Sequence, residues 1–279
     1  VTRIIDQYTR ESGVRGLERE LARLCRKVAR RVVEEGDEVS VEVTKDMVDG
    51  ILGVPRHVRA GLQRDSEVGL VKGLAVTPWG GEVLEIEVAV LPGKGKLLLT
   101  GRLGDWLKES ANAALTYVRS RAEALGIEPD VHETHDIHVH YPGNSLKTDG
   151  PSAGIAMTTA LVSALTGVPA RGDLAMTGEV SLRGRVLPIG GLKEKLLAAW
   201  RQELSTVLIP VVNEKDLPDV PAEVVDGLRI LPVTHMDTVL CEALAWPDGP
   251  PAWLMDRPQF SWLRLNTRRS TGGDRGPRS

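Results

Sequence analysis

The sequence predicts a mixed α/β (α+β) fold rather than a doubly wound one, because strand and helix patterns alternate without a regular βαβ rhythm. Residues 83–90 alternate Glu85 and Glu87 with apolar residues, which is the period of a half-buried strand. Residues 103–125 carry apolar side chains at helical spacing, and residues 153–165 are mostly small and apolar, as in a buried helix. We therefore expect a mixed sheet packed against helices.

The first 55 residues predict a small helical subdomain. Apolar residues recur at helical spacing from Leu17 to Val28, with arginines outside the apolar stripe. A short extended piece at 39–43 then leads to a second helix over about 44–52, which the following glycine and proline end. A unit of this size is too small to be a self-sufficient domain, so we expect it to depend on a neighbouring one.

Residues 67–246 are expected to form the main domain. After the strand at 83–90, a turn at 92–95 predicts a hairpin with a partner strand at 96–100. Further strands are expected at 137–141, 174–180, 185–187, 206–209 and 229–233. Further helices are expected at 191–202 and 236–245.

Two irregular stretches flank this domain. Residues 56–66 are polar and predict a linker, and residues 247–279 predict a proline-rich, largely disordered tail. The chain begins at Val1 without an initiator methionine, so we expect it to be part of a longer polypeptide.

Composition argues against several classes of protein. The formal net charge of -3 gives no reason to expect nucleic acid or a membrane as the main partner. No apolar run is long enough to span a bilayer, and no signal-peptide pattern opens the chain. Cys25 and Cys241 lie far apart in apolar helical patterns, which predicts buried thiols rather than a disulfide. We therefore expect a cytoplasmic protein.

Gly150-Pro151-Ser152-Ala153-Gly154 is the strongest local signal of chemistry. It places a serine at the start of a helix, where main-chain N–H groups are available to an oxyanion. A helix-capping serine is an equally good interpretation of the pentapeptide. The segment also matches the G-x-S-x-G elbow of α/β-hydrolases, but a polar loop precedes it where an elbow needs a strand.

A lysine is the natural candidate to activate Ser152, because His235 is the only histidine after it. Lys195 has Leu192, Ala198 and Ala199 as its helical neighbours, a poor environment for an ammonium ion. Lys193 also lies beside leucines, so helical spacing does not choose between the two. A solvated lysine on an amphipathic helix is the common alternative.

Other patterns in the sequence are weaker signals of a functional site. The histidines at 132, 135, 138 and 140 lack the H-E-x-x-H spacing, so polar strand residues are a better interpretation than a metal site. Neither a P-loop nor a G-x-G-x-x-G motif occurs, so this chain is not expected to hydrolyse nucleotide by itself.

Seven segments together resemble the Lon family of ATP-dependent proteases, over about residues 1–246. Each is weak alone, but their order and intervals make chance agreement implausible. They are YTRESGVRGLEREL (8–21), GLAVTPWGGE (73–82), LPGKGKL (91–97), DIHVH (136–140), DGPSAGIAM (149–157), MTGEVSLRG (176–184) and LPIGGLKEK (187–195).

The resemblance implies that Ser152 is the nucleophile and Lys195 its general base, in a Ser-Lys dyad that cleaves peptide bonds. It implies that Thr177 orients the lysine amine and that Asp149 lies beside the nucleophile, in a segment that shifts between active and blocked conformations. It further implies that Glu87, His138 and His140 lie near the site.

The resemblance also implies the setting of the site. Residues 1–55 resemble the end of an AAA+ lid, and the implied cofactors, ATP and Mg²⁺, belong to an upstream core absent from this chain. The implied partners are misfolded or regulatory polypeptide substrates and further copies of the chain in a hexamer, with no membrane. The alternative hypothesis is a catalytically silent module for oligomerisation or substrate holding.

Overall fold

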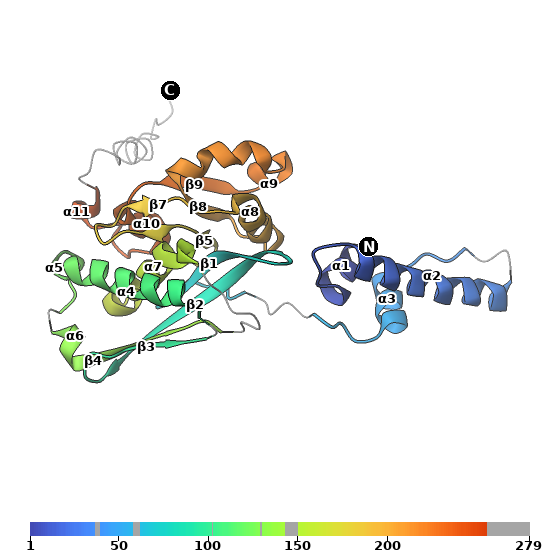
Figure 1. The fold of residues 1–279 in the computed structure, drawn as a ribbon, viewed down its shortest axis with the longest axis horizontal. Coiled ribbons are helices and arrows are strands. Elements are labelled where there is room, and N and C mark those ends of the chain that lie inside the picture. The colour runs from blue at the N-terminus through green and yellow to red at the C-terminus, as the bar shows by residue number, and fades with distance from the viewer. Residues whose placement is uncertain (37–39, 58–61, 102, 129, 143–149, 256–279) are drawn as a thin grey trace, which may run out of the picture. The chain divides into compact units, whose positions relative to one another are not determined.

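A computed structural model describes residues 1–36, 40–57, 62–101, 103–128, 130–142 and 150–255. The chain divides into two compact units (Figure 1). The smaller comprises residues 1–62 with 77–80, and the larger comprises residues 63–76 with 81–279. No helix of the described residues combines the length and apolar character needed to cross a membrane.

The smaller unit is helical, as the sequence predicts. Its helices are α1 (Thr2–Tyr8), α2 (Arg15–Glu35) and α3 (Lys45–Leu52). The apolar stripe of α2 packs with the other two helices around a small core of Ile4, Tyr8, Leu24, Val48 and Leu52. The Tyr8 hydroxyl donates to the main-chain oxygen of Gly53 at 2.7 Å, which fixes the end of α3 against α1.

Two details of this unit differ from the prediction. Residues 40–43 form no strand, so the described part of the expected extended piece is irregular. Cys25 is exposed on α2, so the prediction of a buried thiol there is wrong, because the cysteine lies outside the stripe that faces the core. Cys241 is half-buried, and burial raises the pKa of its thiol to about 12.

The larger unit is built on a seven-stranded, mostly parallel mixed sheet, with the strand order β3-β4-β2-β1-β5-β8-β9. A two-stranded antiparallel sheet, β6-β7, accompanies it. The strands are β1 (Leu70–Thr77), β2 (Gly80–Pro92), β3 (Leu97–Thr100), β4 (His135–His140), β5 (Leu174–Met176), β6 (Glu179–Val180), β7 (Val186–Leu187), β8 (Thr206–Pro210) and β9 (Arg229–Val233). The mixed α/β fold class is therefore confirmed.

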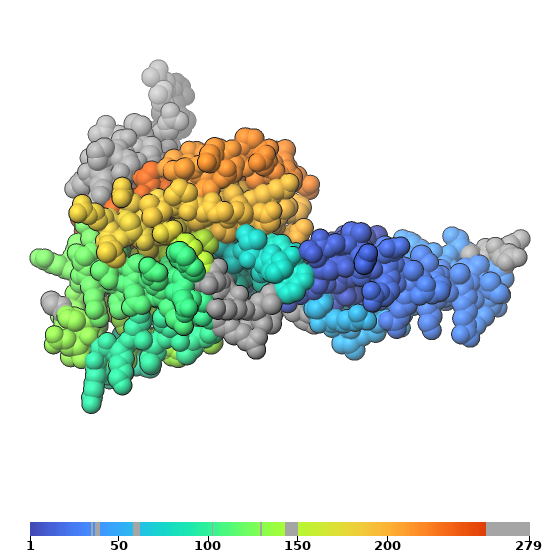
Figure 2. Space-filling view, in the orientation of Figure 1, coloured from blue at the N-terminus to red at the C-terminus, as the bar shows by residue number. Residues whose placement is uncertain are grey.

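Helices surround this sheet, and α7 is the most enclosed of them, with residues 154–163 all buried. Helices α4 and α10 both pack on α7, and in Figure 2 the side chains of α4 (green) adjoin the β6–β7 segment (yellow). The helices of this unit are α4 (Asp105–Ser120), α5 (Ala122–Leu125), α6 (Val131–Thr134), α7 (Gly154–Thr166), α8 (Leu192–Arg201), α9 (Ala222–Asp226), α10 (Met236–Ala243) and α11 (Ala252–Met255). Two 3₁₀ segments complete it, Pro151–Ala153 and Val211–Asp219.

The strand pairing corrects two predictions. The turn at 92–95 does not form a hairpin, because β3 pairs in parallel with β4, and β4 lies between β3 and β2. The single strand expected at 174–180 is two strands, β5 and β6, in different sheets. The break falls at Thr177 and Gly178, and these two residues lie at the candidate site.

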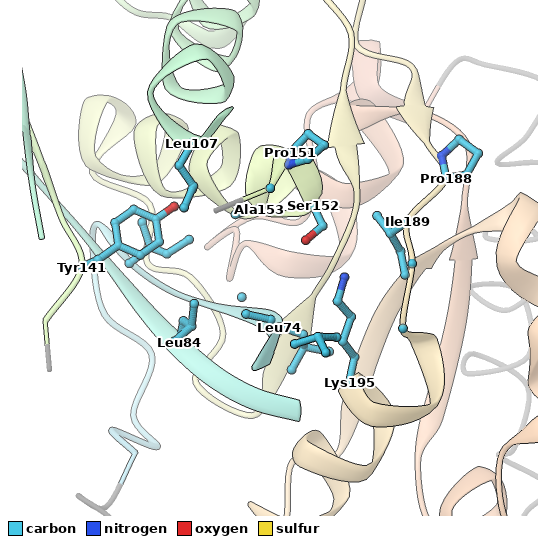
Figure 3. A pocket seen from close by; sticks show the side chains of 17 residues that line it. Leu74, Leu84, Leu107, Tyr141, Pro151, Ser152, Ala153, Pro188, Ile189 and Lys195 are labelled. Atoms are coloured by element: carbon cyan, nitrogen blue, oxygen red, sulfur yellow. The ribbon is translucent and has the colours of Figure 1, made fainter. Parts of the chain in front are cut away.

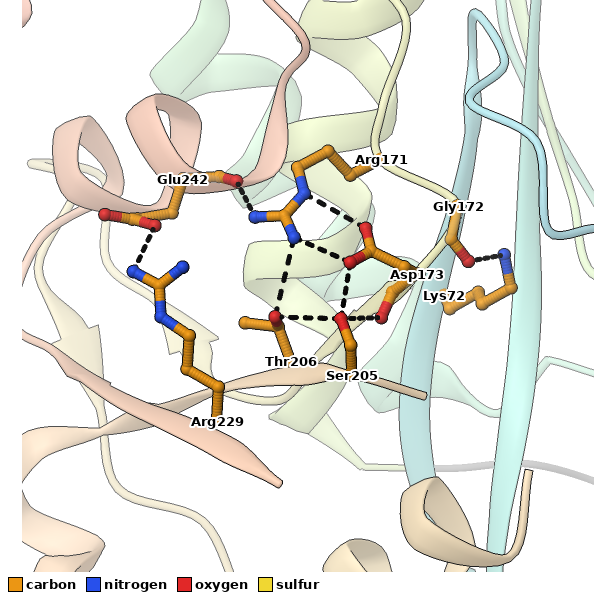
Figure 4. A network of polar contacts seen from close by, with 8 residues as sticks. All are labelled: Lys72, Arg171, Gly172, Asp173, Ser205, Thr206, Arg229 and Glu242. Atoms are coloured by element: carbon orange, nitrogen blue, oxygen red, sulfur yellow. Dashed lines mark hydrogen bonds and ion pairs between the residues drawn. The ribbon is translucent and has the colours of Figure 1, made fainter. Parts of the chain in front are cut away.

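A polar network ties the amino ends of the parallel strands together, beginning at Asp173, which precedes β5 (Figure 4). The Arg171 guanidinium donates to both carboxylate oxygens of Asp173, at 3.0 and 2.7 Å. The buried Lys72 of β1 donates to the main-chain oxygens of Gly172, at 2.8 Å, and of Gln63. Burial lowers the pKa of Lys72, while neighbouring carboxylates oppose the shift.

Part of the proline-rich tail is ordered against the domain. Leu254 of α11 is fully buried, and the Arg121 guanidinium lies 4.9 Å from the centre of the Trp253 ring. The Trp246 indole donates to the main-chain oxygen of Leu240 at 3.0 Å. Residues 256–279, where most of the disorder is expected, lie outside the described residues.

Candidate active site

Ser152 lies in the 3₁₀ turn Pro151–Ala153, immediately before α7. Gly150 has φ = 125°, a conformation that glycine adopts readily, and Pro151 then fixes the first position of the turn. The capping interpretation of Ser152 is wrong, because Ala153 occupies the N-cap of α7 and no side-chain capping bond is made. The serine side chain is therefore not used to hold the helix.

The turn is held through the main chain of Ser152. Its carbonyl oxygen accepts from the Gly178 N–H at 2.8 Å and from the Thr177 hydroxyl at 3.3 Å. In return, the Gly178 carbonyl accepts from the Ile155 N–H at 3.0 Å. The break between β5 and β6 therefore fixes the backbone on which the serine is carried.

Lys195 is buried on α8, with 2% of its surface exposed. Its neighbours Leu192 and Ala199 are buried as well, and its amine donates to the Thr177 hydroxyl at 3.0 Å. Desolvation lowers the pKa of Lys195 to about 8. Lys193 is exposed on the same helix, so the two lysines that helical spacing left equivalent have opposite environments.

Ser152 and Lys195 line one cavity of about 480 Å³. Figure 3 shows the serine hydroxyl and the lysine amine extending into it from opposite elements. Thr177 connects the two residues, since it accepts from the amine and donates to the serine carbonyl. Among the described residues, the amine bonds to Thr177 and not to the serine hydroxyl, so proton transfer needs a short approach of the two side chains.

The cavity lies at the carboxyl end of β5, opposite the network of Figure 4. Thr177 follows β5 directly, and residues 73–76 of the parallel strand β1 form part of the wall. The carboxyl ends of parallel strands are where open α/β sheets bind their ligands. This placement agrees with a site for substrate.

Gly81 at the start of β2 allows α8 to lie where it does. A Cβ atom at this position would lie 1.8 Å from the main-chain oxygen of Glu194 and 3.0 Å from the main-chain nitrogen of Lys195. Real Cβ atoms essentially never approach another atom as closely as the first of these distances. Any side chain here forces β2 and α8 apart, and Lys195 moves with the helix.

We expect Gly81→Ala to lower the peptide cleavage that the resemblance implies by about 10²-fold, the size of loss that a displacement near 1 Å can cause. The assay is the hydrolysis of a fluorogenic peptide. Gly50→Ala is the matched control, because nothing lies within 4 Å of the added atom. Equal activity of the two variants would show that the approach of β2 to α8 does not position Lys195.

Three of the other residues implied by the resemblance, Glu87, His138 and His140, are not brought into this cavity. Glu87 is exposed on β2 and lies opposite His140 in the strand register. The rings of His138 and His140 both contact the Thr100 hydroxyl, at 2.8 and 2.7 Å. None of the three lines the cavity, and Asp149 lies outside the described residues. Within the described ranges, no three His, Cys, Asp or Glu side chains are grouped to hold a metal ion.

Two further residues, one in the wall of the cavity and one that holds a wall residue, were not predicted. Asn213 is buried and holds the Ile189 main chain from both sides, accepting from its N–H at 3.0 Å and donating to its carbonyl at 2.8 Å. Tyr141 follows β4 and lines the cavity. The alternation of Ile137, Val139 and Tyr141 on the buried side of β4 was a usable signal for the tyrosine, whereas no local pattern marks Asn213.

Comparison with known proteins matches both units to one family. Residues 42–246 match the Lon protease (S16) C-terminal proteolytic domain, and residues 1–41 match the Lon protease AAA+ ATPase lid domain. The chain is 56% identical over 245 residues to Lon protease 1 of Syntrophobacter fumaroxidans, covering 88% of this chain and 30% of that protein. It is 54% identical over 258 residues to Lon protease 3 of Sorangium cellulosum, covering 91% of this chain and 31% of that protein.

The chain thus spans about 30% of the length of these curated relatives. The match over residues 42–246 covers most of the sequence and contains every residue of the candidate site. The chain therefore belongs to the Lon family of proteases, with a proteolytic domain that is preceded by a match to the lid domain.

Proposed function

We propose that this domain is a serine endopeptidase in which Ser152 is the nucleophile and Lys195 the general base. The observation that carries the proposal is a lysine whose burial lowers its pKa to about 8, in the same cavity as a serine whose hydroxyl is not used for structure. A lysine in such an environment supplies a neutral amine near neutral pH, which is what proton abstraction from serine requires.

The proposed reaction is acyl transfer. The neutral Lys195 amine takes the proton of Ser152 as Oγ attacks the peptide carbonyl, and main-chain N–H groups at the start of the α7 turn stabilise the oxyanion. The lysine ammonium returns its proton to the leaving amine as the C–N bond breaks. Water, deprotonated by Lys195, then attacks the ester and releases Ser152. Thr177 keeps the amine oriented through its hydroxyl.

The pH dependence of cleavage tests the role of the lysine. Because only the neutral amine acts as a base, kcat/KM should rise with pH and level off above about 8. The measurement is the hydrolysis of a fluorogenic peptide between about pH 6 and pH 10, with circular dichroism to verify the fold at each end. A rate that is flat through this range, or that falls as pH rises, would contradict the assignment of Lys195.

A peptide boronate tests the serine independently of turnover. The boron accepts an oxygen of an activated serine, so we expect inhibition by the peptide boronate and none by the same peptide with a plain carboxylate. The alternative of a catalytically silent module predicts neither inhibition nor hydrolysis. Inhibition or its absence in the 279-residue chain therefore separates the two hypotheses.

Beyond this domain, we propose that the full-length protein is an ATP-dependent protease of the endopeptidase La type, cytoplasmic and hexameric. Its substrates would be misfolded and regulatory proteins, degraded in quality control and the stress response. The support is the lid match and the proteases found as relatives, since these are much longer than this chain. ATP and Mg²⁺ would be held by an AAA+ core, because these 279 residues contain no P-loop. We further propose, from the resemblance, that Asp149, Glu87, His138 and His140 lie near the site.

A further inference from the structure

Asn213 is a buried polar side chain that holds one wall of the cavity from behind. It belongs to the 3₁₀ segment Val211–Asp219, is 2% exposed and does not itself line the cavity. Its carboxamide oxygen accepts from the Ile189 N–H, and its nitrogen donates to the Ile189 carbonyl and, at 2.6 Å, to the Asp216 carboxylate. Because an ionised carboxylate only accepts, this last bond fixes which end of the carboxamide carries the N–H groups.

The contact sets the direction of the neighbouring main-chain groups. The peptide bonds on both sides of Ile189 are trans, and a trans peptide bond places its carbonyl and its N–H on opposite sides. Since the Ile189 N–H points to Asn213, the Pro188 carbonyl points away from Asn213. By the same geometry the Gly190 N–H also points away, because the Ile189 carbonyl faces Asn213. This wall therefore presents an acceptor and a donor on one side, as the edge of a β-strand does.

Both groups belong to residues that are accessible from the cavity. Pro188 and Gly190 are exposed, and both line the cavity that contains Ser152 and Lys195. Figure 3 shows Ile189 on the side of the cavity that carries the serine and the lysine. Among the described residues, neither the Pro188 carbonyl nor the Gly190 N–H makes a hydrogen bond. Glycine has no side chain, so this wall offers main-chain groups to an occupant of the cavity.

We propose that Asn213 is a positioning residue, which holds the Ile189 main chain so that the Pro188 carbonyl and the Gly190 N–H pair with the main chain of the substrate. An extended peptide offers an N–H and a carbonyl for such pairing, which gives affinity whatever its side chains are. The inference rests on the proposed function, because it assigns how the same site holds a peptide. It predicts that binding depends on a substrate N–H at one particular position.

N-methylated substrates test the pairing. The parent is a fluorogenic peptide, and each analogue carries a methyl group on one main-chain nitrogen before the scissile bond. In the wild type, methylation at one position should raise KM by about fivefold, as expected for the loss of one neutral hydrogen bond. The value of kcat should stay within about twofold, because the bond is made equally in the ground state and the transition state.

Asn213→Leu removes the contact with Ile189 and should raise KM for the parent peptide by about fivefold, with kcat within about twofold. The penalty of the methyl group should fall below about twofold in this variant, because the pairing is already lost. The pH at which cleavage levels off should stay at about 8, since Lys195 is unchanged. Asn112→Leu is the matched control and should change none of these values, because Asn112 is exposed on α4 and does not line the cavity.

A wild type that tolerates a methyl group at every position overturns the inference, and so does a penalty that is equal in Asn213→Leu. A lower kcat with a shifted pH profile in the variant overturns it as well, because Asn213 would then act on Lys195 through α8. If Asn213→Leu does not fold, Asn213→Asp takes its place, since it keeps the size and the acceptor but loses the donor to the Ile189 carbonyl.

Binding separates this inference from the proposed function. Fluorescence anisotropy of the labelled parent and methylated peptides with Ser152→Ala measures the methyl penalty without turnover, and the same penalty of about fivefold in Kd is expected. A penalty in binding, together with no cleavage by the wild type, contradicts the proposed function and keeps the main-chain pairing. Cleavage that disappears in Ser152→Ala, with no penalty at any position, does the reverse.

Discussion

Ser152→Ala is expected to lower the hydrolysis of a fluorogenic peptide by at least about 10³-fold, because removal of a nucleophilic hydroxyl leaves only binding and oxyanion stabilisation. The fold should survive. Among the described residues the serine side chain makes no hydrogen bond, and the turn is held by its carbonyl, which the substitution keeps. The midpoint of thermal unfolding should therefore shift by less than about 3 °C.

Ser181→Ala is the matched control for this variant. Ser181 lies beyond β6, where its hydroxyl accepts from the Arg185 N–H at 3.0 Å, and it does not line the cavity. The rate of peptide hydrolysis by Ser181→Ala should stay within about twofold of the wild-type rate, as for substitutions away from a functional site. Full activity in Ser152→Ala would exclude this serine as the nucleophile.

Lys195→Met is expected to lower peptide hydrolysis by at least about 10²-fold, the contribution typical of a general base. Methionine has a similar length and fills the buried space without an ionisable group. Lys193→Met is the matched control on the same helix, and because Lys193 is exposed we expect it to change the rate by less than about twofold. Equal losses in the two variants would contradict the choice of Lys195.

Lys195→Met has a second measurable effect, on the temperature of unfolding. Burial lowers the pKa of Lys195 from its ordinary value of 10.5 to about 8, so below pH 8 the folded protein carries the full cost of a buried ammonium. Between these two values the unfolded chain keeps a proton that the folded protein has released, and wild-type stability rises with pH. Lys195→Met should therefore unfold at a higher temperature than the wild type at pH 7, and this difference should narrow as pH rises from about 8 to 10.5.

Much of the architecture follows from local pattern. The apolar stripe of α2, the unbroken small and apolar run of α7 and the alternation along β2 each specify an element and the side that it buries. Local sequence pattern does not determine which strands pair with one another. Residues 97–100 pair with β4, which follows three helices later in the sequence, rather than with β2, which directly precedes them.

The sequence by itself determined the fold class, the family and the pair of residues to be tested, since the segments around Ser152 and Lys195 can be recognised from the amino-acid sequence alone. Helical spacing left Lys193 and Lys195 equivalent and the family resemblance favoured Lys195, but only the tertiary structure showed that Lys195 is buried while Lys193 is exposed. Only the tertiary structure placed Tyr141 in the wall of the cavity and Asn213 against the main chain of Ile189. The physical reason is that burial and hydrogen bonding depend on elements distant in sequence. Desolvation of the Lys195 amine requires β1, the turn Pro151–Ala153 and α8 to enclose the cavity together, and no local spacing encodes that enclosure.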